Sequence, residues 1–265
     1  MLSWTNATPE VGAGTILGPG HLDAHVTRRI ALPDSPVIER CWWLTWDLTT
    51  ALSNSTIPGL SVQLTWEEKV TRGVQGGFLL TGPSTRRFDV TLDGRGQVLG
   101  VRFLPGAFTG VTGIPAGELT DRTRPAAGVF SLPEVPDPEE MVRAVEARGV
   151  ADERWSSALA AVRLAEMQEV TTVDALAECA GQTPRGLQRM FRHFIGLSPK
   201  SVITRLRLQD ALRTLNTGPA RPAESAGSLA DLAVRLGFYD QAHFTREFRA
   251  FTGHSPGFYA ASQRG

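Results

Sequence analysis

The sequence has few cysteines and no long hydrophobic run, and each of these absences excludes a class of protein. Its net charge is zero, which by itself excludes none. Its 265 residues include two cysteines, Cys41 and Cys179, which lie far apart, so a disulfide-stabilised fold is not expected. No stretch reaches the roughly 18 apolar residues of a membrane span, and the N-terminus lacks a basic segment followed by an apolar core. We therefore expect a soluble cytoplasmic protein with reduced cysteines.

Motifs that would indicate catalysis are also missing. There is no Gly-x-Ser-x-Gly elbow, no cysteine with a nearby histidine and no Gly-rich phosphate loop, since Gly94-Arg95-Gly96 fits a turn. Glu67 and Glu68 fit a solvated strand end. His21 and His25 have the spacing of metal ligands on a helix, but the preceding Gly-Pro-Gly disfavours a helix and no third ligand follows. We expect no enzymatic activity, no metal and no cofactor.

Charge is divided unevenly along the chain. Residues 1–151 carry 13 Lys and Arg against 16 Asp and Glu, a net charge of −3, whereas residues 180–265 carry 12 against 5, a net charge of +7. Binding to a phosphate backbone favours such a basic segment, because affinity comes largely from released counterions. The charge pattern predicts a nucleic-acid partner for the C-terminal third.

One local pattern occurs twice in this third, 57 residues apart. Each copy has a short apolar helix, a turn with Gly, a helix cap (Thr183 or Asp240), and a second helix with apolar positions every three to four residues. This arrangement predicts two helix-turn-helix motifs. The shared landmarks are Leu176, Ala177, Gly181, Leu187, Arg189, Phe191, Phe194, Gly196, Ser198 and Pro199 in the first copy, and Leu232, Ala233, Gly237, Phe244, Arg246, Phe248, Phe251, Gly253, Ser255 and Pro256 in the second.

The polar side of each second helix suits the major groove of DNA. Arg can pair with G, and Gln with A, through two hydrogen bonds. An ordinary amphipathic surface helix would look similar, but the repeated landmarks favour DNA binding. The candidate DNA-binding residues are Arg185, Gln188, Arg189 and Arg192 in the first copy and Gln241, His243, Thr245 and Arg246 in the second.

Residues 199–215, between the two copies, contain regularly spaced apolar residues and no helix breaker after the start. They predict one continuous helix, which over about 15 residues would span roughly 23 Å. A rigid connector of this kind would hold both second helices along one face of DNA, whose repeat is about 34 Å. The polar segment 216–227 would follow as a loop, before Ser228 caps the next helix.

From about Val26 to Phe130 the sequence has the pattern of short β-strands. Short alternating or aromatic runs are separated by Gly and Pro turns, which is typical of a sandwich or barrel. The expected fold class is therefore α+β multidomain. It comprises an N-terminal β-barrel at residues 1–132, a linker with a short helix at 133–151, and an all-α domain at 152–265 with two helix-turn-helix motifs joined by a long helix.

The runs GFYDQAHFTREFRAFTGHSP (237–256) and LQRMFRHFIGLSP (187–199) closely resemble the two helix-turn-helix motifs of AraC/XylS-type transcription regulators. The resemblance covers about 110 residues and implies a seven-helix domain that reads an asymmetric DNA site. Ala242 departs from it, because relatives often have a polar residue there, and Arg189 and Arg246 could hold phosphates instead of reading bases. The base-reading positions that it implies are Arg185, Gln188, Arg189, Gln241, His243 and Arg246.

The N-terminal half more weakly resembles a cupin-like domain that often precedes these motifs, in particular a group with paired Trp and a VxFxPGxF element, here residues 42–43 and 101–108. In that family the domain binds a small effector or dimerises. The aromatic and cationic residues suit an effector pocket, although they could equally be core and surface. Alternation places Arg102 opposite Val101 and Phe103, toward either the lumen or solvent. The candidate pocket residues are Trp42, Trp46, Trp66, Phe78, Arg86, Arg102 and Phe103.

The leading hypothesis is a transcription regulator whose N-terminal domain senses an effector or dimerises. Two alternatives are a constitutive DNA-binding module whose barrel only dimerises, and a cupin-like enzyme with an accessory DNA-binding domain. The candidate partners are double-stranded promoter DNA, RNA polymerase, a small-molecule effector and a second copy of the chain, and no membrane is expected. An effector can act only by binding DNA-competent and DNA-incompetent arrangements unequally.

Overall fold

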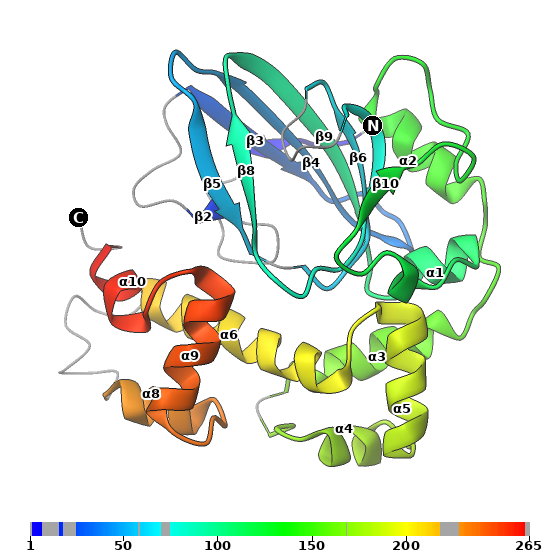
Figure 1. Cartoon of the computed structure of the whole chain (residues 1–265). Coiled ribbons are helices and arrows are strands. Elements are labelled where there is room, and N and C mark those ends of the chain that lie inside the picture. The colour runs from blue at the N-terminus through cyan, green and yellow to red at the C-terminus, as the bar shows by residue number, and fades with distance from the viewer. Residues whose placement is uncertain are drawn as a thin grey trace.

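The computed structural model describes residues 2–6, 16–17, 25–57, 59–69, 75–167, 169–217 and 228–262. A β-rich N-terminal part lies over a row of helices formed by the C-terminal part (Figure 1). His21 and most of the predicted loop 216–227 fall outside the described residues. None of the helices within the described ranges combines the length and the apolar character needed to cross a bilayer.

The N-terminal part contains two antiparallel sheets. The first has seven strands in the spatial order β1 (Thr5–Asn6), β3 (Val26–Ala31), β4 (Ile38–Asp47), β9 (Arg95–Phe103), β6 (Gln63–Glu67), β7 (Gly77–Thr81) and β10 (Thr123–Pro125). The second has three, in the order β2 (Ile16–Leu17), β5 (Leu52–Thr56) and β8 (Phe88–Leu92). The β-rich region is confirmed, but the described strands form two separate ladders, so the predicted closed barrel is not confirmed.

Different elements cover the two faces of the large sheet. Successive side chains of a strand point to opposite faces, so β9 turns Leu99 and Val101 toward covering helices and Val98 toward the small sheet. The covering elements are α1 (Ala107–Thr112), the 3₁₀ turn η1 (Ala116–Glu118) and α2 (Pro138–Glu146). The space between the two sheets is thereby enclosed within the N-terminal part.

The C-terminal part is built around α6 (Pro199–Thr217), which is continuous over 19 residues and confirms the predicted connector. At 1.5 Å per residue it spans about 28 Å. A first helix pair and a second helix pair lie at its two ends (Figure 1). The first pair is α4 (Val173–Cys179) and α5 (Pro184–Met190), and the second is α8 (Leu229–Arg235) and α9 (Gln241–Thr252). Flanking elements are α3 (Trp155–Ala165), η2 (Phe191–Ile195) and α10 (Pro256–Ser262).

Side-chain caps begin the second helix of each pair, as the sequence predicts. The Thr183 hydroxyl accepts a hydrogen bond from the Gly186 N–H at 3.1 Å, and the Asp240 carboxylate accepts one from the His243 N–H at 2.6 Å. Each bond satisfies a backbone donor that has no partner within the helix. Ser228 likewise caps α8, in a reciprocal pair of bonds. The orientation of each second helix is thus determined locally.

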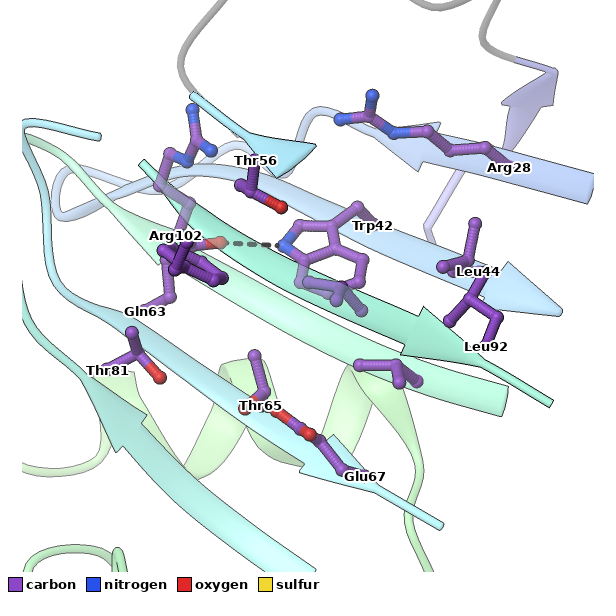
Figure 2. Close-up of a pocket in the computed structure, with 13 residues that line it drawn as sticks. Arg28, Trp42, Leu44, Thr56, Gln63, Thr65, Glu67, Thr81, Leu92 and Arg102 are labelled. Carbon is purple, nitrogen blue, oxygen red and sulfur yellow. Dashed lines mark hydrogen bonds between the residues drawn. The ribbon is translucent and has the colours of Figure 1, made fainter. Parts of the chain in front are cut away.

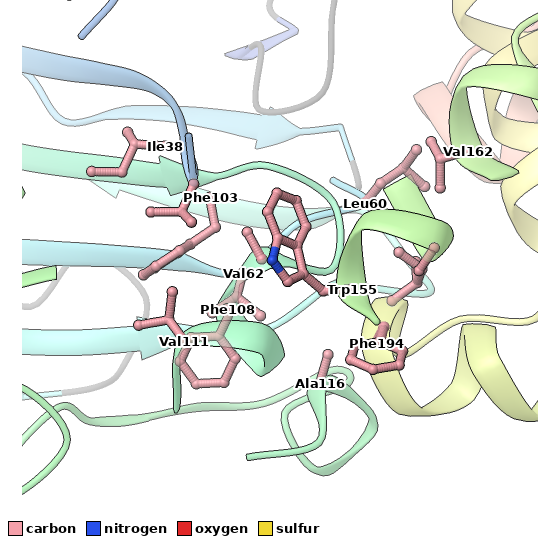
Figure 3. Packing of buried hydrophobic residues seen from close by; sticks show 14 of the residues in the cluster. Ile38, Leu60, Val62, Phe103, Phe108, Val111, Ala116, Trp155, Val162 and Phe194 are labelled. Atoms are coloured by element: carbon pink, nitrogen blue, oxygen red, sulfur yellow. The ribbon is translucent and has the colours of Figure 1, made fainter. Parts of the chain in front are cut away.

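The hydrophobic core runs without interruption from the large sheet into the C-terminal helices. Trp155, at the start of α3, fills a space bordered by Gly106 and Gly110, next to Phe108 and Phe194 (Figure 3). A Cβ on Gly110 would overlap the indole ring, so the glycine makes the contact possible. The first helix pair and the large sheet therefore share one core.

The second helix pair joins the N-terminal part by a smaller contact. Ile57, directly after β5, is fully buried in a separate apolar cluster with Leu212 of α6 and with Phe244 and Phe248 of α9. In Figure 1 the small sheet accordingly lies next to α10 and the upper end of α9. Ile57 is the one residue of the N-terminal part among the buried members of this cluster.

We expect Ile57→Ala to lower the free energy of unfolding by about 2–5 kcal/mol, because it removes buried methyl groups and leaves a cavity. Urea denaturation followed by circular dichroism measures this change. Val135→Ala is the control, since Val135 is 75% exposed and its truncation should cost less than about 0.5 kcal/mol. Equal costs for the two variants would contradict the packing described for Ile57.

Candidate nucleic-acid interface and interior cavity

The eight candidate DNA-binding residues lie away from the buried side of the second helices. In each helix the predicted apolar positions are buried, Leu187 and Phe191 in the first and Phe244 and Phe248 in the second. Six of the candidates are exposed and two are half-buried. The exposed ones are Arg185, Gln188, Arg189, Arg192, Gln241 and Arg246, and the half-buried ones are His243 and Thr245.

His243 is more constrained than its neighbours. Its Nε2 lies 3.9 Å from Oε1 of Glu247, one helical turn further on, and its ring meets Phe238 edge-on with centroids 5.6 Å apart. Its Nδ1 is buried and has no hydrogen-bond partner among the described residues. The imidazole is thus held by contacts inside the second pair, whereas Gln241 and Arg246 project from it.

The last turns of the two second helices differ, although their sequence landmarks match. In α9 the Gly253 N–H bonds to the Arg249 carbonyl, four residues back, at 2.8 Å. In η2 the Gly196 N–H bonds to the Phe191 carbonyl, five residues back, also at 2.8 Å. This wider π turn places Arg192 in a different backbone setting from its counterpart Arg249.

A cavity of about 90 Å³ lies between the two sheets (Figure 2). This is roughly the liquid volume of three water molecules. Two of the seven predicted pocket residues, Trp42 and Arg102, line it. Its other polar lining residues are Arg28, Thr56, Gln63, Thr65, Glu67 and Thr81.

The other five predicted pocket residues lie elsewhere. Trp46 is buried between the sheets with its indole N–H on the Asp93 carbonyl at 3.2 Å. Trp66, Phe78 and Phe103 belong to the core shared with the helices, on the opposite face of the large sheet. Arg86 is exposed on the loop between β7 and β8. Alternation along the strands separates Trp66, Phe78 and Phe103 from the cavity, whereas Trp46 shares the inner face with Trp42 but lies beyond the lining.

Arg102 is a deeply buried cation of the cavity, with 5% of its side chain exposed. Its Nη1 lies 4.0 Å from Oε1 of Glu39, a distant ion pair. Burial lowers the pKa of Arg102 to about 10, with Glu39 opposing the shift and Arg40 and Arg28 adding to it. The guanidinium therefore remains charged at neutral pH, and its positive charge is only weakly balanced by the distant carboxylate of Glu39.

Two glycines of β9 make room for two tryptophans of β4. Trp42 is paired with Gly100 and Trp46 with Gly96 across the strands. A Cβ on either glycine would overlap the facing indole ring. The missing side chains let the rings lie over the neighbouring strand, and the Trp42 N–H thereby reaches Oε1 of Gln63 at 3.1 Å.

Sequence reasoning missed the polar wall that β6 contributes to the cavity. Gln63, Thr65 and Glu67 alternate with Leu64, which is buried on the other face. The expectation that Glu67 stands at a solvated strand end is wrong: it is 2% exposed, and the Thr65 hydroxyl donates to it at 3.3 Å. Only Glu68 is exposed. Within the described ranges no three His, Cys, Asp or Glu side chains gather as a metal site.

Two family models match the chain. Residues 176–262 match a helix-turn-helix domain, and residues 33–125 match a domain of unknown function (DUF6597). The chain is 32% identical over 111 residues to an uncharacterized HTH-type transcriptional regulator of Haemophilus influenzae, covering 42% of this chain and 35% of that protein. It is 31% identical over 94 residues to the HTH-type transcriptional activator AarP of Providencia stuartii, covering 36% of this chain and 64% of AarP.

Among solved structures, ToxT from Vibrio cholerae is similar over 85% of this chain and 98% of its own, with 10% identity and a TM-score of 0.42. A score of this size supports no conclusion about function. The family match and the relatives do define the C-terminal part as a helix-turn-helix domain. It is a domain of the AraC type, as the resemblance implies, and it follows an N-terminal domain of a family without assigned function.

We expect Gly100→Ala to lower the free energy of unfolding by about 1–3 kcal/mol, because the new methyl group displaces the Trp42 ring from its bond with Gln63. Urea denaturation measures the loss, which should shrink in a Trp42→Phe background if the indole is its cause. Gly257→Ala is the control, since a Cβ there meets no atom within 4 Å. An undiminished loss in that background would contradict this explanation.

Proposed function

We propose that this protein is a sequence-specific DNA-binding transcription regulator of the AraC/XylS type. The observation that carries the proposal is the presence of two capped helix pairs at the ends of one uninterrupted helix, each with exposed Arg and Gln side chains on its second helix. The match of residues 176–262 to a helix-turn-helix domain supports it. The relatives are named as transcriptional regulators, and no enzymatic activity is part of the proposal.

The two helix pairs act as two helix-turn-helix readers of one duplex. The length of α6, about 28 Å, is close to the 34 Å or so that separates successive turns of the major groove. Arg189 and Arg246 occupy equivalent positions in the two second helices and are both exposed. Each is able to pair with a guanine or to hold a phosphate, and these roles differ in sequence dependence and salt dependence.

We expect Arg189→Ala and Arg246→Ala each to weaken specific DNA binding by about 1–3 kcal/mol, roughly 5- to 150-fold in Kd. Fluorescence anisotropy at fixed salt, on a site selected by the full chain from random-sequence DNA, measures this loss. Arg143→Ala is the matched control, because Arg143 is an exposed arginine on α2, in the N-terminal part. Unchanged affinity in both variants would reject the assignment of these residues.

The same titrations at several salt concentrations separate the two roles. Loss of a phosphate contact should reduce the slope of log K against log salt by about 1 and weaken all sequences alike. Loss of a base contact should leave the slope near its original value and relax the preference at one position of the selected site.

We further infer that the cavity receives a small effector with an acceptor or anionic group. The deep burial of Arg102, its distant partner Glu39, and the amide group of Gln63, whose Oε1 already accepts from Trp42, support this assignment. Enclosed polar groups with apolar walls are typical of small-molecule sites. In the alternative hypothesis the N-terminal domain only dimerises, and the cavity then binds no ligand.

A thermal-shift screen of the full chain against small carboxylic acids and their neutral amides tests the effector. We expect an acid to raise the melting temperature and Arg102→Gln to remove that shift. Arg95→Gln is the matched control, because Arg95 is exposed at the start of the same strand. If the acid still raises the melting temperature of Arg102→Gln, Arg102 does not bind its anionic group. If no compound raises the melting temperature and the chain forms a concentration-dependent dimer, the dimerising alternative is favoured.

A further inference from the structure

The loop between β7 and β8, residues 82–87, contacts both helix pairs, and we name it the strap. At one end, a Cβ on Gly196, where the second helix of the first pair ends, would lie 2.8 Å from Cγ of Pro83. At the other end, a Cβ on Gly253, where α9 ends, would lie 2.7 Å from Nη1 of Arg87. The strap thus bridges the ends of the two candidate DNA-reading helices.

The strap also holds the helix that joins the two pairs. Arg205 of α6 is 5% exposed, and its guanidinium donates to the Ser84 carbonyl of the strap and, at 3.0 Å, to the Gly59 carbonyl. Burial lowers the pKa of Arg205 to about 10, with Asp121 opposing the shift. Both acceptors belong to the N-terminal part, so α6 is tied to it by a charged group that is enclosed at the contact.

Asp121 fixes the conformation of the strap. Its carboxylate accepts hydrogen bonds from the Thr85 N–H at 2.6 Å and the Thr85 hydroxyl at 2.5 Å. The Ser84 hydroxyl lies 3.3 Å from the same carboxylate, but its closer acceptor is the Arg86 carbonyl. The Asp121 N–H donates to the Pro83 carbonyl at 2.9 Å. Partial burial raises the pKa of Asp121, but the bonds from Thr85 and Ser84 and the nearby Arg86 outweigh it, so the net shift is downward.

Asp121 has a φ of 58°, and among the described residues it is the one non-glycine with positive φ. Asp tolerates this left-handed conformation better than most residues, but it remains less favourable than the ordinary regions. Backbone strain of this kind persists where surrounding contacts impose it, and it is often found at functional positions. Here the contacts that impose it are those with the strap.

The strap starts and ends at the wall of the cavity. Thr81, the last residue of β7, and Phe88, the first of β8, both line it, and so does Thr56, which directly precedes the buried Ile57. Three wall positions therefore lie within a few residues of contacts with α6 or the second helix pair. A change in the spacing of the two sheets would move these contacts directly.

Two further hydrogen bonds join the end of the first helix pair to the N-terminal part. The Thr120 hydroxyl donates to the Gly196 carbonyl at 2.6 Å, and the Thr109 hydroxyl donates to the His193 carbonyl at 3.3 Å. The first pair also shares the core of the large sheet, whereas the second has its own apolar cluster. A displaced strap would therefore move the second pair relative to the first.

We propose that the strap, fixed by Asp121, couples the cavity between the sheets to the orientation of the two helix pairs about α6, whose own length is constant. With the strap seated, the pairs are held in one arrangement. A ligand in the cavity that displaces the end of β7 or the start of β8 changes that arrangement. The proposal rests on the proposed function, since it describes how an effector in the cavity would alter DNA reading.

Distance measurement by pulsed electron paramagnetic resonance tests the coupling without DNA or ligand. One spin label is attached to Cys179 of α4, which is exposed, and the other to a cysteine introduced by Val234→Cys on α8, where the native side chain is 69% exposed. Cys41 escapes labelling because it is fully buried, and burial and Glu146 raise its pKa to about 12. The label separation reports the placement of the two pairs.

Asp121→Asn keeps the size of the side chain and the tolerance of positive φ, but it leaves one acceptor oxygen, so the bonds from the Thr85 N–H and the Thr85 hydroxyl cannot both be accepted. We expect a broader distance distribution than in the labelled parent. Glu118→Gln is the matched control, an exposed carboxylate in the same segment whose loss should leave the distribution unchanged. An unchanged distribution in Asp121→Asn, or equal broadening in the control, overturns the proposal.

Thr85→Val removes the hydroxyl donor with little change of shape, and it should broaden the distribution in the same way. It supplies the decisive comparison if melting curves show that Asp121→Asn is not folded. Unchanged distances in a folded Thr85→Val variant would then overturn the proposal.

Val90→Phe tests the link to the cavity, because the larger side chain fills the cavity from β8. If this variant does not fold, Phe88→Ala replaces it and enlarges the cavity next to the strap. We expect either to shift the mean label distance in the parent and to shift it less in an Asp121→Asn background, because the two changes act through one contact. No shift in the parent overturns the proposal. Since DNA is absent, this outcome is independent of whether Arg189 and Arg246 prove to bind DNA.

Discussion

The packing of Trp155 against Gly106 and Gly110 is the contact on which the arrangement of the chain depends. Burial of a tryptophan removes about 150–250 Å² from water and contributes about 4–6 kcal/mol. The Nε1 of this ring is buried without a hydrogen-bond partner among the described residues, which costs about 1–3 kcal/mol. The apolar gain exceeds that cost, so the first helix pair and the large sheet remain together and provide a fixed frame for the rest.

The hydrogen bonds that hold the strap are easier to rearrange than the packing around Trp155. The bonds from Thr85 to Asp121 are exposed, and each contributes about 0.5–1.5 kcal/mol, or somewhat more because the acceptor is charged. Their sum is similar to typical coupling free energies between sites, about 1–3 kcal/mol. Separation at Trp155 would also expose the rest of the core that the large sheet shares with the first helix pair. Of these contacts, we therefore propose the strap as the element that changes and the shared core as the part that stays.

Local signals in the sequence predict the C-terminal helices well. Caps such as Thr183 and Asp240 and the apolar spacing determine helices within a few residues, and α6 follows from the absence of breakers. The β-rich region is confirmed but its closure into a barrel is not, because alternation tells which face of a strand is buried but not which edges pair. Glu67 was misplaced for a related reason: a polar residue on an inner face looks like one on an outer face until the opposite sheet is known. The π turn at η2 gave no signal, since its landmarks match those of α9.

The charge and the volume of the cavity limit the kind of effector that we propose for it. An apolar molecule next to Arg102 would remove water from a guanidinium whose acidic partner is 4.0 Å away, and burial of a charge without a partner is costly. An occupant with an anionic or acceptor group avoids this cost. Only a few non-hydrogen atoms fit in about 90 Å³. A larger ligand would extend through the open side of the pocket or push on Phe88 and Val90 of β8. In the second case binding would also displace the strap, because Phe88 follows it directly.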